Sequence, residues 1–104
     1  MTRVLTSADF DSTIATGVTL VDMYADWCGP CQALAPTIEK LSHDYEGKAN
    51  ITKLDVDASG DIAQRYGVMS IPTILFFKDG QMVGKTVGLQ SKENLENELN
   101  KHLA

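Results

Sequence analysis

The segment VTLVDMYA, residues 18–25, constrains the fold of this chain more than any other part of its sequence. Nearly all of its residues are apolar, and several are β-branched or aromatic, which is the pattern of a strand buried on both faces. Such a strand lies inside a sheet that has helices on both sides. We therefore expect a layered α/β protein built around this strand, with its only carboxylate, Asp22, buried.

Helix and strand signals alternate along the rest of the chain. Serine is a favourable helix cap, and Asp-Gly is the dipeptide that a tight hairpin turn prefers. Strand-helix alternation followed by a hairpin and a helix indicates an α/β sandwich with a mixed sheet. The expected elements are a helix from Ser7 to about Thr16, a helix from about Cys31 to Tyr45 kinked at Pro36, a strand in residues 50–58, a short helix in 60–67, a hairpin in 73–88 turning at Asp79-Gly80, and a last helix capped by Ser91 with a stripe of Leu95, Leu99 and Leu103.

Composition limits both the organisation and the partners. The 104 residues are 43% apolar, which is enough to build one hydrophobic core, and no linker or repeat divides them. We expect a single domain over residues 1–104. The net charge of -5 and the lack of a Lys/Arg run argue against nucleic acid and against an anionic membrane. No secretory signal pattern opens the chain, so we expect a cytoplasmic protein.

The motif DWCGPCQ, residues 26–32, holds the only two cysteines, Cys28 and Cys31. It lies where the buried strand stops and a long helix begins. The first turn of a helix has unpaired N–H groups and a partial positive charge, which favour a thiolate at Cys28. Pro30 suits helix entry, and the Cys31 thiol can donate a hydrogen bond to the thiolate. Because the thiolate is the form that attacks disulfides, the motif favours thiol–disulfide exchange.

Other uses of two cysteines fit the sequence less closely. A zinc site would have to recruit His43 and His102, which match no zinc-finger spacing. An iron–sulfur cluster needs more cysteines, and covalent haem attachment needs a histidine where this chain has Gln32. A purely structural disulfide would close too short a loop to restrict the unfolded chain much. Zinc binding and a structural disulfide remain as alternatives to redox exchange.

Beyond these residues, the whole chain resembles the thioredoxin family. WCGPC follows an Asp-containing buried strand, SIPT lies downstream, and the segments VDMYADWCGPC, TKLDVD, YGVMSIPTILFFKDG and VGLQSKENL occur in the family's order and spacing. The resemblance implies a single thioredoxin domain, a three-layer α/β/α sandwich whose central mixed sheet of about five strands, the fourth antiparallel, is flanked by four helices. It also implies that Cys28 and Cys31 form a redox-active disulfide.

The resemblance assigns a role to four residues. It implies that Cys28 attacks a protein disulfide, that the less exposed Cys31 resolves the mixed disulfide, that Asp22 assists the proton transfer, and that Lys53 is its charged companion. Burial should raise the pKa of Asp22 toward neutrality. On position alone, Asp22 could instead be a hydrogen-bonded structural carboxylate and Lys53 a solvated residue of a strand face.

A client-binding surface is also implied by the resemblance. Ile71-Pro72 would be a cis peptide whose turn offers the Ile71 backbone to an extended client segment. A lone tryptophan is more often core than contact, but Trp27 adjoins the reactive thiol. Tyr24, Asp26 and Gln32 depart from the commonest family residues, which puts the redox tuning in doubt but not the class. The implied surface consists of Trp27, Gly29, Pro30, Ile71, Pro72, Val87, Gly88 and Leu89.

The source of electrons must lie outside this chain. No G-x-G-x-x-G follows a predicted strand, so we expect no dinucleotide site and no bound cofactor. By resemblance, NADPH would supply electrons through a thioredoxin reductase to a monomer that reduces disulfides of client proteins. Three functional classes remain as alternatives: a disulfide reductase, a disulfide oxidant or isomerase, and a non-enzymatic scaffold. The Gly-Pro pair between the cysteines favours the reductase.

Overall fold

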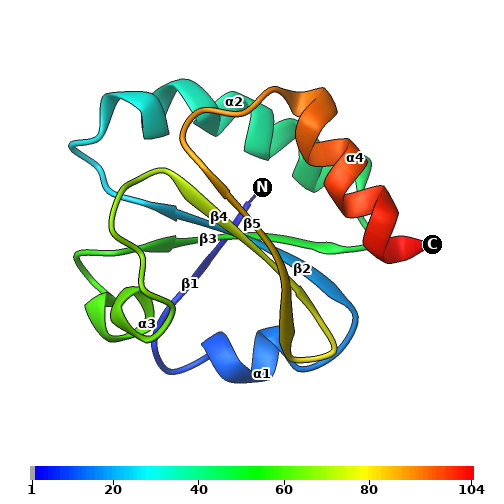
Figure 1. Cartoon of the computed structure of the whole chain (residues 1–104), viewed down its shortest axis with the longest axis horizontal. Coiled ribbons are helices and arrows are strands. Elements are labelled where there is room, and N and C mark those ends of the chain that lie inside the picture. The colour runs from blue at the N-terminus through cyan, green and yellow to red at the C-terminus, as the bar shows by residue number, and fades with distance from the viewer. Residues whose placement is uncertain (1) are drawn as a thin grey trace.

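Five strands and four helices make up the computed structural model, which describes residues 2–104 (Figure 1). The strands are β1 (Arg3–Leu5), β2 (Val18–Tyr24), β3 (Asn50–Asp55), β4 (Thr73–Lys78) and β5 (Gln81–Val87). The helices are α1 (Phe10–Ile14), α2 (Gly29–Asp44), α3 (Gly60–Arg65) and α4 (Lys92–Leu103). The strands form one sheet in the order β1-β3-β2-β4-β5. Because β4 runs antiparallel to both of its neighbours and the other pairs are parallel, the sheet is mixed, as predicted.

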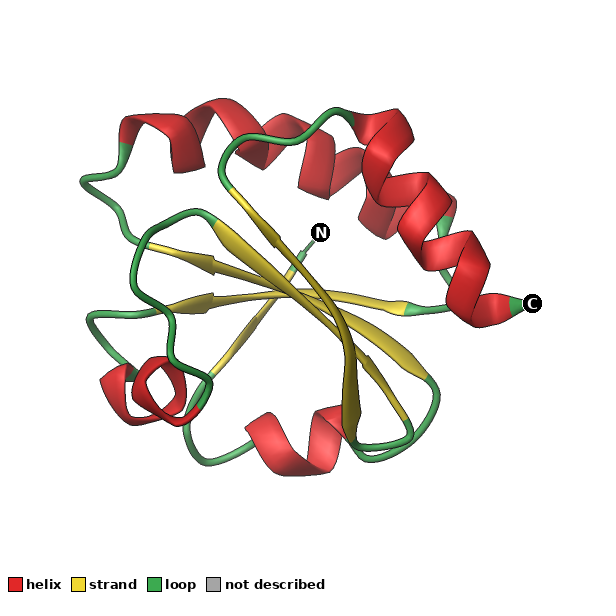
Figure 2. Cartoon of the chain, in the orientation of Figure 1, coloured by secondary structure: helices red, strands yellow, loops and turns green. Residues whose placement is uncertain are grey.

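The helices cover the two faces of the sheet in pairs (Figure 2). Helices α2 and α4 lie on one face, and α1 and α3 lie on the other. Each face has its own hydrophobic cluster. The first contains Leu34, Ile38 and Leu41 of α2 with Leu95 and Leu99 of α4, and the second contains Phe10 and Ile14 of α1 with Ile62 and Ala63 of α3. This arrangement is the predicted three-layer α/β/α sandwich.

Strand β2 occupies the centre of the sheet, between β3 and β4. Its first six residues are buried and only Tyr24, at its carboxyl end, is half-buried. Asp22 lies opposite Lys53 of β3 on one side and Ile74 of β4 on the other. The prediction of a strand buried on both faces, with a carboxylate inside it, is therefore confirmed.

Helix α2 begins at Gly29, two residues before the predicted start. Cys28 is its N-cap residue and Pro30 lies in its first turn, where the missing N–H of proline leaves no helical hydrogen bond unmade. Pro36 lies inside the helix, as the sequence predicts. The early start places both cysteines on the amino end of one helix.

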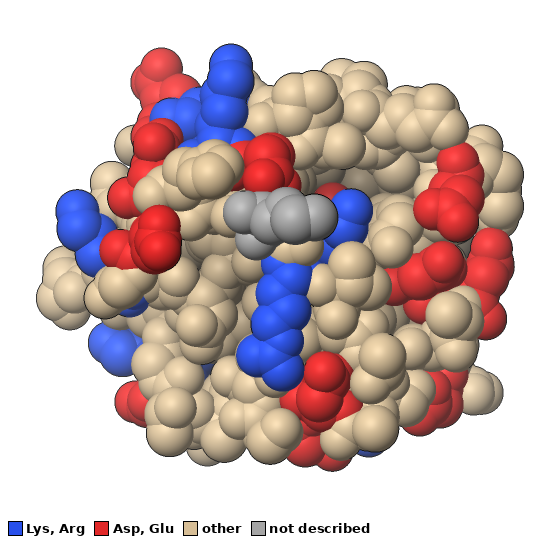
Figure 3. Space-filling view, turned by 180° about the vertical axis from the view of Figure 1, so that it is seen from behind, with Lys and Arg blue, Asp and Glu red and all other residues tan. Residues whose placement is uncertain are grey.

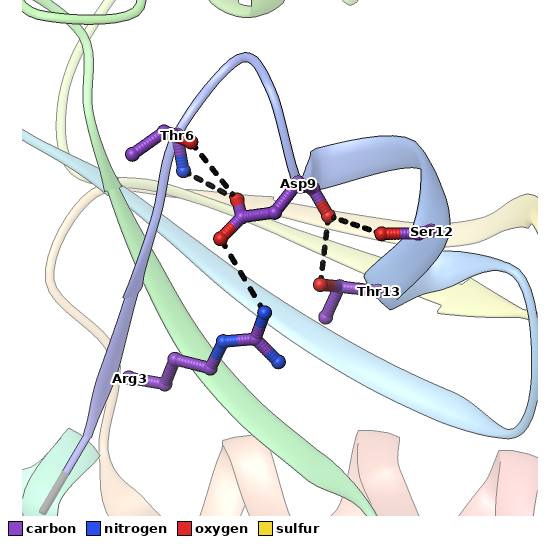
Figure 4. Close-up of polar contacts among 5 residues, drawn as sticks. All are labelled: Arg3, Thr6, Asp9, Ser12 and Thr13. Atoms are coloured by element: carbon purple, nitrogen blue, oxygen red, sulfur yellow. Dashed lines mark hydrogen bonds and ion pairs between the residues drawn. The ribbon is translucent and has the colours of Figure 1, made fainter.

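The predicted first helix is wrong at both ends, because α1 spans only Phe10–Ile14. Ser7 does not cap it: its hydroxyl donates to Asp61 at the start of α3. The chain turns instead at Asp9, whose Oδ1 accepts hydrogen bonds from the backbone N–H of Thr6 at 2.7 Å and from its hydroxyl at 3.2 Å (Figure 4). This turn uses residues that the predicted cap at Ser7 had placed in the helix. The remaining contacts of Asp9 in Figure 4 are with Arg3, Ser12 and Thr13.

The carboxyl-terminal elements agree with the sequence. Asp79 and Gly80 have φ values of 50° and 88°, the left-handed pair that a tight hairpin turn requires between β4 and β5. The Ser91 hydroxyl accepts a hydrogen bond of 3.1 Å from the backbone N–H of Asn94 and so caps α4. Residues Leu95 and Leu99 of its apolar stripe are buried, whereas Leu103, in the last turn, is exposed.

Charged side chains of both signs are interspersed on the face shown in Figure 3, where acidic groups gather along one side. The longest helix, α2, has 16 residues, and within residues 2–104 no helix has the length and apolar character of a membrane span.

Candidate active site

The two cysteines meet at the carboxyl end of β2, where the chain enters α2 (Figure 1). Cys28 and Cys31 form a disulfide with a Cα–Cα separation of 5.2 Å, so the structure represents the oxidised state. Their spacing of three residues along one helix turn brings the sulfurs together without help from a distant part of the chain. The pair therefore combines a local disulfide with a fixed position at a helix end.

The Sγ atom of Cys28 accepts a hydrogen bond of 3.2 Å from the backbone N–H of Cys31. This N–H is one of the donors at the helix start that have no partner inside the helix. In the reduced protein the same donor and the positive end of the helix dipole stabilise a thiolate on Cys28. The geometry therefore supplies to Cys28 the stabilisation that the sequence predicts.

Exposure does not separate the two cysteines, contrary to the expectation that Cys31 is the more covered one. Cys28 is 5% exposed and Cys31 is 4% exposed. The two residues form one small cluster with Ala25, and Ile71 packs against this cluster from another part of the chain. Because this cover comes from a distant loop, the motif alone could not reveal it. The difference between the cysteines lies in their position on the helix.

The loop that contains Ile71 and Pro72 lies directly against the disulfide. The Ile71-Pro72 peptide bond is cis, as the resemblance implies, and the Ile71 carbonyl oxygen lies 3.8 Å from Cys28 Sγ. The Pro72 carbonyl oxygen accepts a hydrogen bond of 2.8 Å from the N–H of Gly88. Cys28 thus contacts the Ile71-Pro72 segment, and this segment in turn is bonded to the segment that contains Gly88.

These segments contain every residue expected to contact clients, and we call this set the active-site rim. Trp27 is 71% exposed, so it is a surface residue and not a core residue. Val87 and Leu89 are exposed apolar residues. They flank Gly88, whose N–H is bonded to Pro72. The full active-site rim comprises Trp27, Gly29 and Pro30, which are exposed, Ile71 and Gly88, which are half-buried, Pro72, which is buried, and the exposed Val87 and Leu89.

Two residues near the active-site rim were missed by the sequence reasoning. Met69 is 95% exposed and lies two positions before Ile71. The sequence did contain a signal for Met69, because an apolar residue stands directly before the SIPT segment. Asp57 accepts a hydrogen bond of 2.7 Å from the indole N–H of Trp27. No local pattern links these two residues, which are 30 positions apart.

Asp22 lies at the wall of a cavity of about 550 Å³ that Cys31 and Lys53 also line. Its side chain is buried, and its Oδ1 atom has no hydrogen-bond partner. Burial raises the pKa of Asp22 from 3.8 to about 7, and the nearby charge of Lys53 opposes this rise. An orphaned oxygen does not fit a hydrogen-bonded structural carboxylate. A carboxyl group with this pKa can take or give a proton near neutral pH.

Lys53 stands opposite Asp22 in the parallel register of β2 and β3. It is half-buried and lines the cavity, so it is not a freely solvated strand residue. Its Nζ atom lies 5.1 Å from the centre of the Tyr24 ring. Gln32, one of the departures from the family pattern, donates a hydrogen bond of 2.8 Å to the carbonyl oxygen of Asp26 and ties the helix to the preceding turn.

The histidines that a zinc site would need lie elsewhere. His43 is 3.5 Å from Glu39 on α2, and His102 is 2.7 Å from Glu98 on α4. In the described part of the chain, no three residues of the types His, Cys, Asp and Glu are grouped as metal ligands would be. The cysteines are paired with each other, which is the arrangement that redox exchange uses.

A disulfide at the amino end of the helix that follows a central buried strand, with a buried carboxyl group in the cavity that Cys31 lines, defines a thiol–disulfide exchange protein. Comparison with known proteins specifies the family. The model of the thioredoxin family matches residues 1–101. Thioredoxins of Staphylococcus aureus, including those of strains N315 and COL, are 60% identical over 99 residues, which is 95% of this chain and 95% of each relative.

Solved structures agree with this assignment. A mutant thioredoxin from Halobacterium salinarum NRC-1 superimposes with a TM-score of 0.91 at 36% identity, covering 98% of this chain and 90% of that one. The thioredoxin of Malassezia sympodialis gives 0.90 at 33% identity, covering 99% and 94%. The chain belongs to the thioredoxin family. It is a thiol–disulfide oxidoreductase that carries no bound cofactor, and its redox group is the Cys28–Cys31 disulfide.

Proposed function

We propose that this chain reduces disulfides of client proteins, with Cys28 as the attacking thiol and Cys31 as the resolving thiol. In the first step the Cys28 thiolate attacks one sulfur of the client disulfide. A bond forms between Cys28 Sγ and that sulfur while the client S–S bond breaks. The second client sulfur leaves as a thiolate and takes up a proton. The product of this step is a mixed disulfide.

The second step needs a proton acceptor for Cys31. Ionised Asp22 takes the proton from the Cys31 thiol, and the resulting thiolate attacks Cys28 Sγ. The bond between Cys28 and the client breaks, and the Cys28–Cys31 disulfide forms. The client leaves with two thiols, so two electrons have passed to it. The shared cavity of Cys31, Asp22 and Lys53 supports this route, as does a pKa of about 7 for Asp22.

One observation carries the division of roles: Sγ of Cys28 accepts the hydrogen bond from the Cys31 N–H at the start of α2. This donor stabilises negative charge on Cys28 and not on Cys31. A lower pKa raises the thiolate fraction at neutral pH.

Clients bind across the active-site rim in this proposal. An extended client segment pairs with the Ile71 backbone, and the exposed apolar side chains of Trp27, Val87 and Leu89 cover its flanks. Met69 extends the same surface. The family's partners are in general a reductase and proteins with disulfides. We propose that NADPH supplies the electrons here through a thioredoxin reductase. The cytoplasmic location, the monomeric state and the single domain over residues 1–104 stay predictions.

The test replaces each cysteine by serine in cell extract. Cys31→Ser keeps the first step and lacks the second nucleophile, so mixed disulfides with clients should accumulate on non-reducing gels and disappear when dithiothreitol is added. Cys28→Ser is the matched control and should trap far less. Equal trapping by the two variants would contradict the division of roles. Absence of trapping, together with no reduction of insulin disulfides by the unaltered protein, would favour a scaffold.

The direction of the reaction needs a separate measurement. The unaltered protein is equilibrated with glutathione buffers of graded ratio, and the fraction of disulfide is determined. A reductase should stay oxidised in buffers that already reduce an oxidant or isomerase. Full reduction in the most oxidising of these buffers would contradict the proposed direction.

A further inference from the structure

Asp22 and Lys53 are neighbours that do not form an ion pair. They are register partners on β2 and β3, and both line the cavity of about 550 Å³ that Cys31 also lines. Lys53 is absent from all ion pairs of the described residues, and Asp22 Oδ1 is without any hydrogen-bond partner. A cation beside a buried carboxylate is attracted to it, and the charge of Lys53 favours the ionised form of Asp22. The contact that Lys53 does make is with an aromatic ring.

The Tyr24 ring is the partner that Lys53 has instead. Tyr24 lies two positions after Asp22, so the two side chains leave β2 on the same face of the sheet. The Lys53 Nζ atom stands 5.1 Å from the ring centre, within the range of a cation–π contact. Such a contact is modest at a partly exposed site and stronger when water is excluded. The ring and the carboxylate therefore compete for one cation.

We propose that Tyr24 is a positioning residue that holds the Lys53 ammonium group at its ring and away from Asp22, which keeps the Asp22 carboxyl group free to exchange a proton with Cys31. The inference rests on the proposed role of Asp22. The competition of the Tyr24 ring and the Asp22 carboxylate for the Lys53 ammonium group does not depend on that role. It can be measured without any catalytic turnover. It also gives a function to Tyr24, one of the positions at which this chain departs from the commonest family residue.

The other groups that face the cavity do not account for the position of Lys53. From the turn after β2 comes Asp26, and from α2 come Glu39 and Cys31. Asp26 is exposed, and Glu39 accepts hydrogen bonds of 2.9 and 2.8 Å from Thr2. On the β4 side the register partner of Asp22 is the uncharged Ile74.

The Tyr24 hydroxyl brings no charge of its own. Burial, followed by the charges of Asp55, Asp26 and Asp22, raises the pKa of Tyr24 above 10.0. The phenol is therefore neutral at pH 7, and the ring face, not the hydroxyl, is the part that attracts the cation.

The test compares two substitutions of Tyr24. In Tyr24→Leu the cation loses its ring and can move to the carboxylate, so the pKa of Asp22 should fall by about one unit or more. Tyr24→Phe keeps the ring face and should leave the Asp22 titration within a few tenths of a unit. The pKa is followed by the carboxyl carbon resonance of Asp22 in the oxidised protein, which requires no client and no reductase.

A smaller side chain also admits water to the cavity, and water alone would lower the pKa of Asp22. The same Tyr24→Leu change is therefore made in a Lys53→Met background. If Tyr24 acts through Lys53, the fall should disappear in this background. A fall of equal size with and without Lys53, or no fall in either, would overturn the proposal.

A measurement on the unaltered protein keeps the proposal testable if Tyr24→Leu does not fold. Protons held over the face of an aromatic ring resonate upfield, so the Cε protons of Lys53 should lie clearly upfield of those of exposed lysines such as Lys48. Normal Lys53 shifts would overturn the proposal. Loss of catalysis in Asp22→Asn tests the proposed function instead, so the two ideas can fail separately.

Discussion

Trp27 and Asp57 are joined by a hydrogen bond of 2.7 Å from the indole Nε1 to Oδ2 of the carboxylate. The bond connects the turn before α2 with the turn after β3, and it fixes the orientation of an indole that is 71% exposed. A large apolar side chain that is already ordered loses less conformational freedom when a client covers it. The bond therefore prepares the active-site rim for binding.

Removal of the hydrogen bond that anchors Trp27 to Asp57 should weaken client binding. Asp57→Ala leaves the indole free to rotate, and we expect KM for a disulfide-containing protein such as insulin to rise about fivefold, equivalent to ~1 kcal/mol, with little change in kcat. Steady-state kinetics measures both constants. Asp26→Ala, which removes an exposed neighbouring carboxylate and keeps the acceptor of the indole N–H, is the control. In a Trp27→Phe background Asp57→Ala should have no further effect, and a second loss there would contradict the assignment.

Asp22→Asn should separate activity from stability. Asp22 has a pKa of about 7 in the folded protein and an ordinary value of 3.8, so the folded state binds the proton more tightly than the unfolded chain does. Stability contributed by this proton is complete below pH 3.8 and is lost as the pH rises toward 7. The loss is at most about 4 kcal/mol, from about 1.4 kcal/mol per pKa unit. The amide cannot titrate, so the stability of Asp22→Asn relative to the unaltered protein should increase over this pH range.

Urea unfolding at several pH values measures this difference, and Asp26→Asn serves as an exposed control. Disulfide reduction by Asp22→Asn at pH 7 should fall by about tenfold or more, because the base for Cys31 is missing. A stability difference that stays constant with pH, or unchanged turnover, would favour a structural role for Asp22.

Gly88→Ala should cost stability and binding together. Gly88 has φ of +89°, a backbone conformation that costs a residue with Cβ about 1–2 kcal/mol, although the added methyl group would meet no atom within 4 Å. Relief of this strain would move the N–H that binds Pro72. Gly29→Ala, in the first turn of α2 with equal free space and no positive φ, is the matched control and should not lower the unfolding free energy. Equal unfolding midpoints for the two variants would contradict the argument.

The layers of the fold could be predicted because their signals are local and strong. The apolar run of β2 has no plausible position except the middle of a sheet, and Asp79-Gly80 specifies a hairpin by backbone conformation alone. The sequence indicated the helix cap at Ser91 equally clearly. In each case one short stretch carries the whole physical reason for the structure.

The predictions that were wrong concern residues whose contacts are made with partners far away in the sequence. Ser7 has the chemistry of a cap, but its hydroxyl is bound to Asp61, and the chain turns at Asp9 instead. The near-equal burial of Cys28 and Cys31 depends on a contact with Ile71, 43 residues beyond Cys28. Composition and periodicity contain no information on such contacts.

The site itself was predictable in its chemistry and only partly in its surroundings. The spacing of Cys28 and Cys31 after a buried strand indicated redox exchange, and family resemblance added Asp22 and the cis bond at Pro72. The cavity wall and the anchor of Trp27 remained hidden, because each joins side chains from separate elements. Roles for these residues stay predictions until the variants above are measured.

The contact of Cys28 Sγ with the Ile71-Pro72 segment, which is bonded to Gly88, also has a consequence for a chain that is still being made on the ribosome. Both cysteines precede Ile71 by at least 40 residues, so they are translated before Ile71 and Gly88. At that stage the motif has no neighbouring loop to cover its sulfur and no sheet to bury Asp22. Until Ile71 has been added, the nascent chain therefore carries a dithiol that lacks the cover this residue provides in the folded protein.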